Sequence, residues 1–201
     1  GDMPSRDLQL EWIDQNTNDI TAKLKASLSE GGCAAVICNR INRAQKVYDA
    51  VCTAFKDEDV EIFLFHSRYP FLWRKRIEEQ ILERFGKNKA SRPHKAIVIA
   101  TQVIEQSLDL DFDLMISDLA PVDLLIQRIG RLHRHEEKIT STKRPLLLKE
   151  PMCIISAPQF SPQLTQRDFG SDQYIYEPYL LLRTLLGLKG RDSVRLPQET
   201  D

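Results

Sequence analysis

The sequence has almost no net charge, no long apolar run and few cysteines. Its 28 Lys and Arg nearly balance 29 Asp and Glu, for a formal net charge of −1, so overall electrostatics do not predict a nucleic-acid-binding protein. No apolar run reaches the length of a membrane span, and the N-terminus does not resemble a signal peptide, so no membrane partner is expected. The 201 residues have the length of one domain.

The cysteine and histidine spacings exclude a disulfide framework and predict no metal site. No two cysteines form a C-x-x-C pair, and three lie in apolar runs, which indicates small core thiols in a reducing cytoplasm. His133 and His135 flank Arg134 without a third ligand nearby, so no metal is expected there. The four cysteines are Cys33, Cys38, Cys52 and Cys153.

Three motifs of nucleotide and metal chemistry are also missing. The chain has no G-x-x-x-x-G-K-[ST] phosphate loop. No strand ends in Asp-Glu-x-His or Asp-Glu-x-Asp, and there is no His-Asp nuclease signature. Asp57, Glu58 and Asp59 precede a predicted strand, which excludes them as a magnesium-binding box.

The sequence does contain short apolar runs that alternate with amphipathic segments. The runs are rich in β-branched residues and apolar on both faces, as buried parallel strands are. Each is followed by helical spacing, so the sequence predicts an α/β fold, with a parallel sheet flanked by helices. Predicted strands cover 33–38, 60–65, 96–100, 114–117 and 152–155, and predicted helices cover 41–55, 71–85, 122–132 and 177–188.

Polar residues follow three of the predicted strands. Ligands of parallel sheets bind at the carboxyl ends of strands, so these positions predict a binding edge. The stretch 68–95 is also basic and has only three acids; nucleic-acid contact and a solvated helix face both fit it. The polar positions are Asn39 and Arg40, His66 to Arg68, and Thr101 to Asp109.

Two blocks about thirty positions apart carry the strongest signal. The first, Ala-Thr-Gln-Val-Ile-Glu-Gln-Ser-Leu-Asp-Leu-Asp-Phe-Asp, begins at Ala100, and the second, Gln-Arg-Ile-Gly-Arg-Leu-His-Arg, begins at Gln127. The second holds Arg128, Arg131 and Arg134 at helical spacing, which predicts guanidinium groups on one helix face. Such groups stabilise the charge that develops on the terminal phosphates of a nucleotide.

These residues resemble the second RecA-like domain of superfamily 2 helicases. The closer resemblance is to the CRISPR-associated helicase–nuclease of type I interference systems, whose block at 101–111 has Ser, as Ser107 here, where other branches usually have Gly. The other matching motifs lie at 36–45, 66–68, 120–123 and 127–134. The resemblance implies a RecA-like three-layer αβα domain over 31–160. It leaves 1–30 as a lead-in helix that starts like a cloning remnant, and 161–201 as a linker and C-terminal helix.

The resemblance implies roles for both blocks. Arg131 and Arg134 match arginine fingers that reach the γ-phosphate of ATP held by another domain, and Gln127 matches a residue that positions the attacking water or the γ-phosphate. Contacts to ATP are expected from Ser107 through its backbone N–H, from Asp109 to the ribose or a finger arginine, and from Gly130 through close packing.

Nucleic-acid contacts are implied at the strand ends. Thr101 matches a residue whose hydroxyl holds a phosphate, and its alternative is a strand-end Thr that bonds its own backbone. Backbone contacts carry no sequence information, so binding should be non-specific and salt-sensitive. The remaining candidates are His66, Ser67 and Arg68 in a phosphate-tracking loop, and Asn39, Arg40 and Arg43 as weaker contacts.

The resemblance also implies partners and a reaction. The chain is expected to form half an ATPase cleft of a single-stranded DNA translocase in CRISPR interference, and to hydrolyse no ATP alone. A first RecA-like domain, which mainly holds Mg²⁺, and a nuclease domain are expected upstream in the same protein, with the CRISPR surveillance complex as a further partner. Three alternatives remain: another superfamily 2 helicase, a non-catalytic α/β interaction module, or half of a glycosyltransferase.

Overall fold

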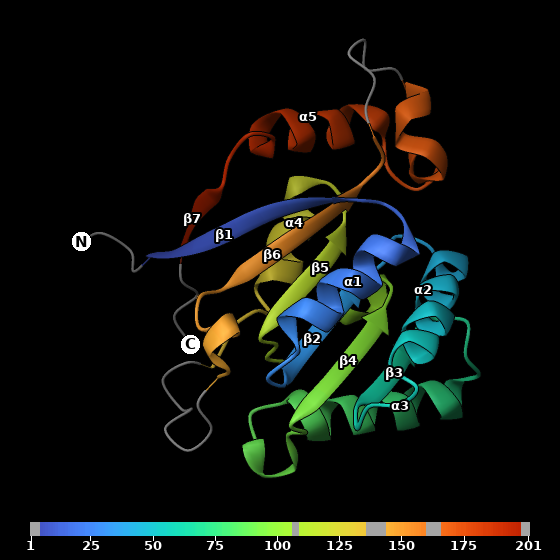
Figure 1. The fold of residues 1–201 in the computed structure, drawn as a ribbon. Helices are drawn as coiled ribbons and strands as arrows, with labels where there is room; N and C mark the ends of the chain where they lie inside the picture. The colour runs from blue at the N-terminus through green and yellow to red at the C-terminus, as the bar shows by residue number, and fades with distance from the viewer. Residues whose placement is uncertain (1–4, 106–108, 136–143, 160–165, 198–201) are drawn as a thin grey trace.

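The computed structural model describes residues 5–105, 109–135, 144–159 and 166–197, and it confirms the predicted α/β fold. In these residues seven strands form one sheet in the order β3-β4-β2-β5-β6-β1-β7 (Figure 1). Neighbouring strands are parallel except β7, which is antiparallel to β1. The strands are β1 (Ser5–Asp14), β2 (Gly32–Ile37), β3 (Glu61–Phe65), β4 (Lys95–Ala100), β5 (Leu114–Asp118), β6 (Met152–Ala157) and β7 (Ser193–Pro197).

Helices cover both faces of the sheet, which makes the three-layer αβα arrangement. Helices α1 and α2 pack on one face, and α3, α4 and α5 pack on the other. No helix in the described ranges has both the length and the apolar character needed to span a bilayer. The helices are α1 (Thr17–Ser27), α2 (Ile41–Ala54), α3 (Phe71–Phe85), α4 (Val122–Ile129) and α5 (Pro178–Leu188), with 3-10 turns η1 (Lys89–Ser91), η2 (Gln102–Glu105), η4 (Leu146–Leu148) and η5 (Gln166–Tyr174).

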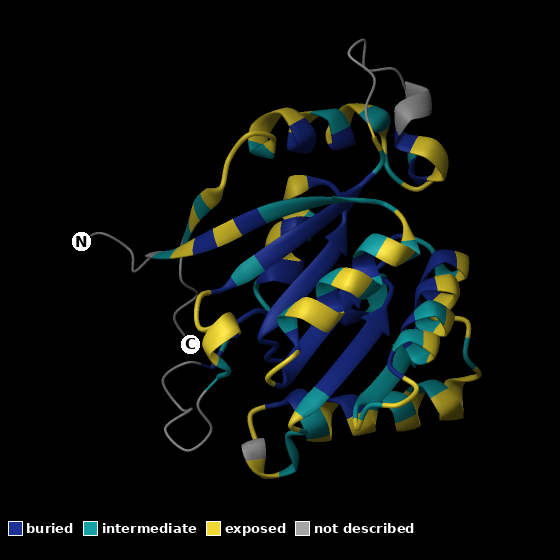
Figure 2. Cartoon of the chain, viewed as in Figure 1, coloured by how far each residue is buried: buried dark blue, intermediate teal, exposed yellow. Residues whose placement is uncertain are grey.

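The central strands are buried along their length, as Figure 2 shows for β2, β4 and β5. Val36 and Ile99 belong to the core under α1 and α2, whereas Ile37 and Val98 belong to the core under α3, α4 and α5. Because both faces are covered, these strands appear in the sequence as unbroken apolar runs. The sheet is therefore a packed platform that fixes the positions of the loops at its edges.

The ends of the chain differ from the expectation. The sequence predicts a lead-in helix over 1–30, but residues 5–14 form β1, which pairs with β6, and only then does α1 begin. Leu8 and Leu10 are buried while Asp7 and Gln9 are exposed, the two-residue alternation of a strand. β7 pairs in turn with β1. β1 and β7, which lie in segments expected outside the RecA-like domain, thus extend its sheet.

Local sequence determines several element ends. Asn16 caps α1 by accepting a hydrogen bond from the backbone N–H of Asp19 at 2.8 Å. Pro178 occupies the first turn of α5, where its missing N–H costs no helical hydrogen bond. Gly32 enters β2 with φ of +111°, and a Cβ there would lie 2.5 Å from Cδ1 of Leu148, so this position requires glycine.

Candidate functional site

The polar residues that follow three predicted strands lie at one edge of the sheet. β3, β4 and β2 are neighbours, and Phe65 and Ile37 both pair with Ala100. The backbone N–H of Thr101 donates to the carbonyl of Phe65 at 3.1 Å, and that of Cys38 donates to the carbonyl of Ala100 at 2.8 Å. Thr101 is itself buried. The loops after these strands therefore form a single edge, as the sequence predicts.

Asn39 lies buried within this edge, where every polar atom of its side chain has a protein partner. Its Nδ2 donates to the carbonyl of Leu119 at 2.8 Å and to Oδ2 of Asp172 at 3.0 Å. Its Oδ1 accepts from Arg128 at 3.3 Å, and its backbone N–H donates to Asp118 at 3.0 Å. This geometry favours a structural role over the predicted phosphate contact.

Arg43 is also held inside the protein. Its Nε donates to both carboxylate oxygens of Asp118, at 2.8 and 2.9 Å, and its Nη2 donates to the hydroxyl of Ser156 at 3.1 Å. Burial alone lowers the pKa of Arg43, but the charge and hydrogen bond of Asp118 outweigh it and raise the pKa above its ordinary value. Of the three weaker candidates, only Arg40 is partly exposed, and it pairs with Asp172 at 3.3 Å.

The loop after β3 presents Ser67 and Arg68 to solvent but buries His66. Nδ1 of His66 accepts the backbone N–H of Arg68 at 3.2 Å, and its ring stacks on Tyr69 with centroids 4.2 Å apart. Burial lowers the pKa of His66, so the ring is neutral at pH 7. His66 therefore shapes the loop, and of the three candidates only Ser67 and Arg68 are exposed.

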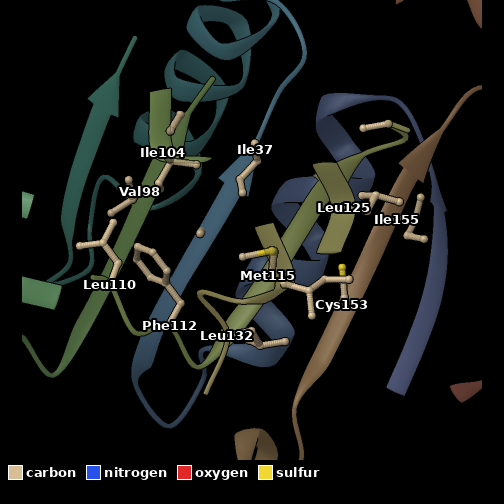
Figure 3. Packing of buried hydrophobic residues seen from close by; sticks show 14 of the residues in the cluster. Ile37, Val98, Ile104, Leu110, Phe112, Met115, Leu125, Leu132, Cys153 and Ile155 are labelled. Atoms are coloured by element: carbon tan, nitrogen blue, oxygen red, sulfur yellow. The ribbon is translucent and has the colours of Figure 1, made fainter. Parts of the chain in front are cut away.

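Two buried apolar residues lie within the first block, one on each side of Ser107 in the sequence. Ile104 in η2 and Leu110 are fully buried, and Figure 3 shows both packed against the sheet close to Val98, with Phe112 beside Leu110. These anchors fix both ends of the segment that contains Ser107. Ser107 itself lies outside the described residues, so its predicted ATP contact has no structural description.

The three arginines of the second block do not share a helix face. α4 ends at Ile129, so Arg131 and Arg134 lie in the turn that follows it. Arg128, in the last turn of α4, is fully buried, and its Nε donates to Oε1 of Glu105 at 2.6 Å. The predicted row of three guanidinium groups on one helix face is therefore wrong, because the helix ends early and its own arginine points into the protein.

Asp109 contacts three basic side chains. Its Oδ1 lies 2.9 Å from Nε of Arg134 and 2.8 Å from Nε2 of His135, and its Oδ2 lies 3.2 Å from Nζ of Lys87. Partial burial raises the pKa of Asp109, but the hydrogen bond from Lys87 and the charges of His135, Lys87 and Arg134 outweigh it and leave the pKa below its ordinary value. The carboxylate thus orients Arg134, a contact of the kind that the resemblance implies for this acid.

Arg131, in the second block, contacts the first block through its side chain. It is partly buried, and its Nη2 donates to the backbone carbonyl of Glu105 at 3.4 Å. Gly130 is the C-cap residue directly after α4. A Cβ there would lie 3.3 Å from the carbonyl oxygen of Gln127, which is tighter than ordinary contact. Nη1 of Arg134 donates to the carbonyl of Gly130 at 3.3 Å. Gln127 is exposed on α4, so the candidate nucleotide residues that the structure describes gather around one turn.

Sequence reasoning missed Tyr176, which connects η2 with Arg128. Nε2 of Gln102 donates to the carbonyl of Asn39 at 2.7 Å and to the hydroxyl of Tyr176 at 3.2 Å. The same hydroxyl accepts from Arg128 at 3.3 Å, and Arg128 is held by Glu105. Arg128 and Gln102, the hydrogen-bond partners of Tyr176, lie 48 and 74 positions away in the sequence. No local sequence pattern could therefore reveal these contacts.

The chain is similar to known proteins along most of its length. A family model described as CRISPR-associated nuclease/helicase Cas3, C-terminal, matches residues 30–137. The chain is 41% identical over 179 residues to the CRISPR-associated nuclease/helicase Cas3 of Streptococcus thermophilus, which covers 88% of this chain and 18% of that protein. It is 45% identical over 143 residues to the CRISPR-associated endonuclease/helicase Cas3 of Thermus thermophilus, covering 70% and 14%. The chain spans less than a fifth of the length of these relatives.

Solved structures show the same likeness. The crystal structure of T. fusca Cas3-AMPPNP is 37% identical, with a TM-score of 0.88, and the match covers 98% of this chain and 23% of that one. The chain is also similar to part of a structure described as a CRISPR RNA-guided surveillance complex, pre-nicking. The identity is 35% and the TM-score is 0.83, and the match covers 98% of this chain and 24% of that one. The shared fold therefore extends beyond the family-model match to nearly the whole chain.

Proposed function

The chain belongs to the family of CRISPR-associated nuclease/helicase Cas3 C-terminal domains, and on that basis we propose that it is the second RecA-like domain of an ATP-driven motor that acts on single-stranded DNA in CRISPR interference. The observation that carries this proposal is the contact between Asp109 and Arg134, which brings the first block against the second, next to Arg131. One turn thus holds the arginines, and the carboxyl ends of β2, β3 and β4 hold the DNA candidates.

The side chains of this turn fit a polyphosphate. Arg131 and Arg134 are partly accessible cations, and Asp109 orients the second of them without burying it. Bound ATP supplies the phosphoryl group that is transferred to water. Arg131 and Arg134 would stabilise the negative charge that develops during transfer, and such an arginine is worth on the order of 10³–10⁵ in rate. Gln127, exposed on α4 before the turn, would position the attacking water.

The chain would form one wall of the ATPase cleft. It has no phosphate loop, and Asp109 is already shared by three basic side chains. We therefore assign Mg²⁺ and the phosphate loop to a first RecA-like domain of the same protein. That protein would also carry the nuclease domain and meet the CRISPR surveillance complex in the cytoplasm.

The DNA grip would come from the residues that follow the carboxyl ends of β2, β3 and β4. Ser67, Arg68 and Arg40 are accessible, and Thr101 follows the neighbouring strand. Contacts of this kind go to phosphates, so binding would be independent of sequence and weakened by salt. Closure of the two domains around ATP would then shift the grip of one domain relative to the other.

ATP hydrolysis tests the proposal most directly. In the full-length protein, with magnesium and single-stranded DNA, we expect Arg131→Ala to lower DNA-stimulated hydrolysis by about 10³-fold or more. Arg191→Ala, which removes an exposed arginine outside the edge, should hydrolyse ATP like the wild type. Turnover in Arg131→Ala within a few-fold of the wild type would contradict the finger role.

The half-cleft assignment has its own test. The 201-residue chain alone should show no magnesium-dependent ATP turnover above background. Clear turnover by this chain that Arg131→Ala abolishes would show that the cleft is complete without a second domain.

A further inference from the structure

Three consecutive large apolar side chains at the start of α3 are exposed to solvent. Phe71, Leu72 and Trp73 are 67%, 69% and 62% exposed, and we call them the apolar ridge. The far end of the same helix is different, since Ile81 and Phe85 are fully buried. Single exposed apolar residues are ordinary, but three large ones together at the first turn of one helix mark a candidate interaction surface.

The ridge is not an unfinished part of the core. Trp73 stands in the same helical row as Ile77, Ile81 and Phe85, which succeed one another at four-residue steps. The later members of this row pack against the sheet. The first turn of α3 therefore extends beyond the hydrophobic core, and Trp73 remains exposed to solvent.

The surroundings of the ridge are basic. Residues 66–77 contain four Arg and Lys and no Asp or Glu. Within the described part of the chain none of these four forms an ion pair. The guanidinium of Arg74 lies 5.8 Å from the centre of the Phe71 ring, a cation–π contact that braces the ring. The four residues are Arg68, Arg74, Lys75 and Arg76.

These features define the chemistry of the occupant. An anionic occupant fits best, because residues 66–77 carry four basic side chains and no acid, and it must offer apolar faces to two aromatic rings. Single-stranded DNA has both properties, since its phosphates are charged and its unpaired bases expose their π-faces. The ridge also follows directly on the loop whose Ser67 and Arg68 are placed for phosphate contact.

We propose that the apolar ridge is a base-stacking platform for single-stranded DNA. The rings of Phe71 and Trp73 stack on bases while Ser67 and Arg68 hold the adjoining phosphates. This inference rests on the proposed function, because the loop that contains Ser67 and Arg68 would bring the strand to the ridge. Stacking is tolerant of sequence, since every base has a π-face, but the bases of a duplex are already stacked. The ridge would therefore select single strands.

The fluorescence of Trp73 reports stacking directly. The chain has two tryptophans, Trp12 and Trp73, so Trp12→Phe leaves Trp73 as the only one. At low salt, which strengthens phosphate contacts, oligothymidine should quench this fluorescence. An abasic strand of equal length should bind without quenching it, and duplex DNA should not quench it either.

Affinity measurements separate stacking from phosphate contact. By fluorescence anisotropy, Phe71→Ala and Trp73→Ala should each weaken labelled oligothymidine by about fivefold or more, since a stacked base contributes at least about 1 kcal/mol. Neither change should alter the affinity for the abasic strand, and Trp73→Phe should retain most of the binding. Leu186→Ala, which removes a side chain 65% exposed on α5, should leave both affinities unchanged.

Arg68→Ala distinguishes failure of this inference from failure of the proposed function. It should weaken oligothymidine and abasic strand alike. If it does so while Phe71→Ala and Trp73→Ala bind both probes like the wild type, the stacking platform is refuted and the phosphate grip stands. If Arg68→Ala changes neither affinity, or the wild type binds neither probe at low salt, both ideas are refuted. Loss of self-association in the ridge variants, with DNA binding intact, would assign the ridge to a second copy instead.

Discussion

Replacing Arg128 with Met should destabilise the protein strongly although the residue belongs to the arginine-rich block. Arg128 is fully buried. Its Nε donates to Glu105 at 2.6 Å, and its Nη1 donates to the hydroxyl of Ser117 at 3.0 Å and to Oδ1 of Asn39 at 3.3 Å. Met fills a similar volume without charge, so the substitution leaves the nearly buried carboxylate of Glu105 without its counter-ion.

The expected cost follows from that burial. Removing one partner of a buried ion pair costs about 3–5 kcal/mol, because the remaining charge is desolvated and uncompensated. Oδ1 of Asn39 also loses its donor, because Arg128 is the residue that donates to it, so we expect the free energy of unfolding to fall by about 3–5 kcal/mol. For a chain of this size that corresponds to a melting temperature about 6–20 °C lower.

Urea unfolding followed by circular dichroism measures this cost. The midpoint of Arg128→Met should fall at an unchanged slope, while the exposed-site control Arg191→Met should stay within about 0.5 kcal/mol of the wild type. Adding Glu105→Gln to Arg128→Met should recover part of the loss, because the orphaned charge is removed. A loss below about 1 kcal/mol for Arg128→Met would refute the assignment of Arg128 to a buried structural network.

Three further outcomes test other parts of the structure. Gly32→Ala should lower the free energy of unfolding by more than about 1 kcal/mol in urea titration, because φ is +111° and the new Cβ meets Leu148; an unchanged midpoint would contradict this packing. Iodoacetamide should alkylate Cys52 before the other three thiols in the native protein, because Cys52 is half-buried and the other three are buried. Burial also raises the pKa of Cys153 to about 12. Equal labelling of the four thiols by mass spectrometry would contradict the burial of Cys33, Cys38 and Cys153. Asp109 has a lowered pKa, so its stabilisation is complete above the ordinary Asp pKa and is lost as pH falls through the folded value. Asp109→Asn should therefore reduce the loss of stability below about pH 4 by up to about 1 kcal/mol, and identical acid titrations would show that its ion pairs add nothing.

The strand and helix pattern was predictable wherever burial is complete. β2, β4 and β5 are covered on both faces, so each leaves an apolar run in the sequence, and each helix leaves a stripe at its own period. β1 and β7 were missed because their alternation is short and mixed with charged residues. Only pairing with β6 and with each other makes these segments strands.

The candidate site was predictable as a place but not as an arrangement. Parallel strands end at one edge, so polar residues after them had to meet, and the described ones do. Which of them remain accessible depends on partners far along the chain. Asn39 and Arg43 are enclosed by Asp118 and Asp172, whereas Ser67 and Arg68 are not.

The sequence by itself determined the fold class, the family motifs and the strand ends at which they meet, because periodicity and motif spacing are local properties of the chain. Only the tertiary structure decided that α4 ends before Arg131, that Arg128 turns inward to Glu105, and that Asp109 orients Arg134. It also decided that Trp73 remains outside the core. Burial and ion pairing are properties of surfaces brought together from distant segments, so no one-dimensional pattern encodes them.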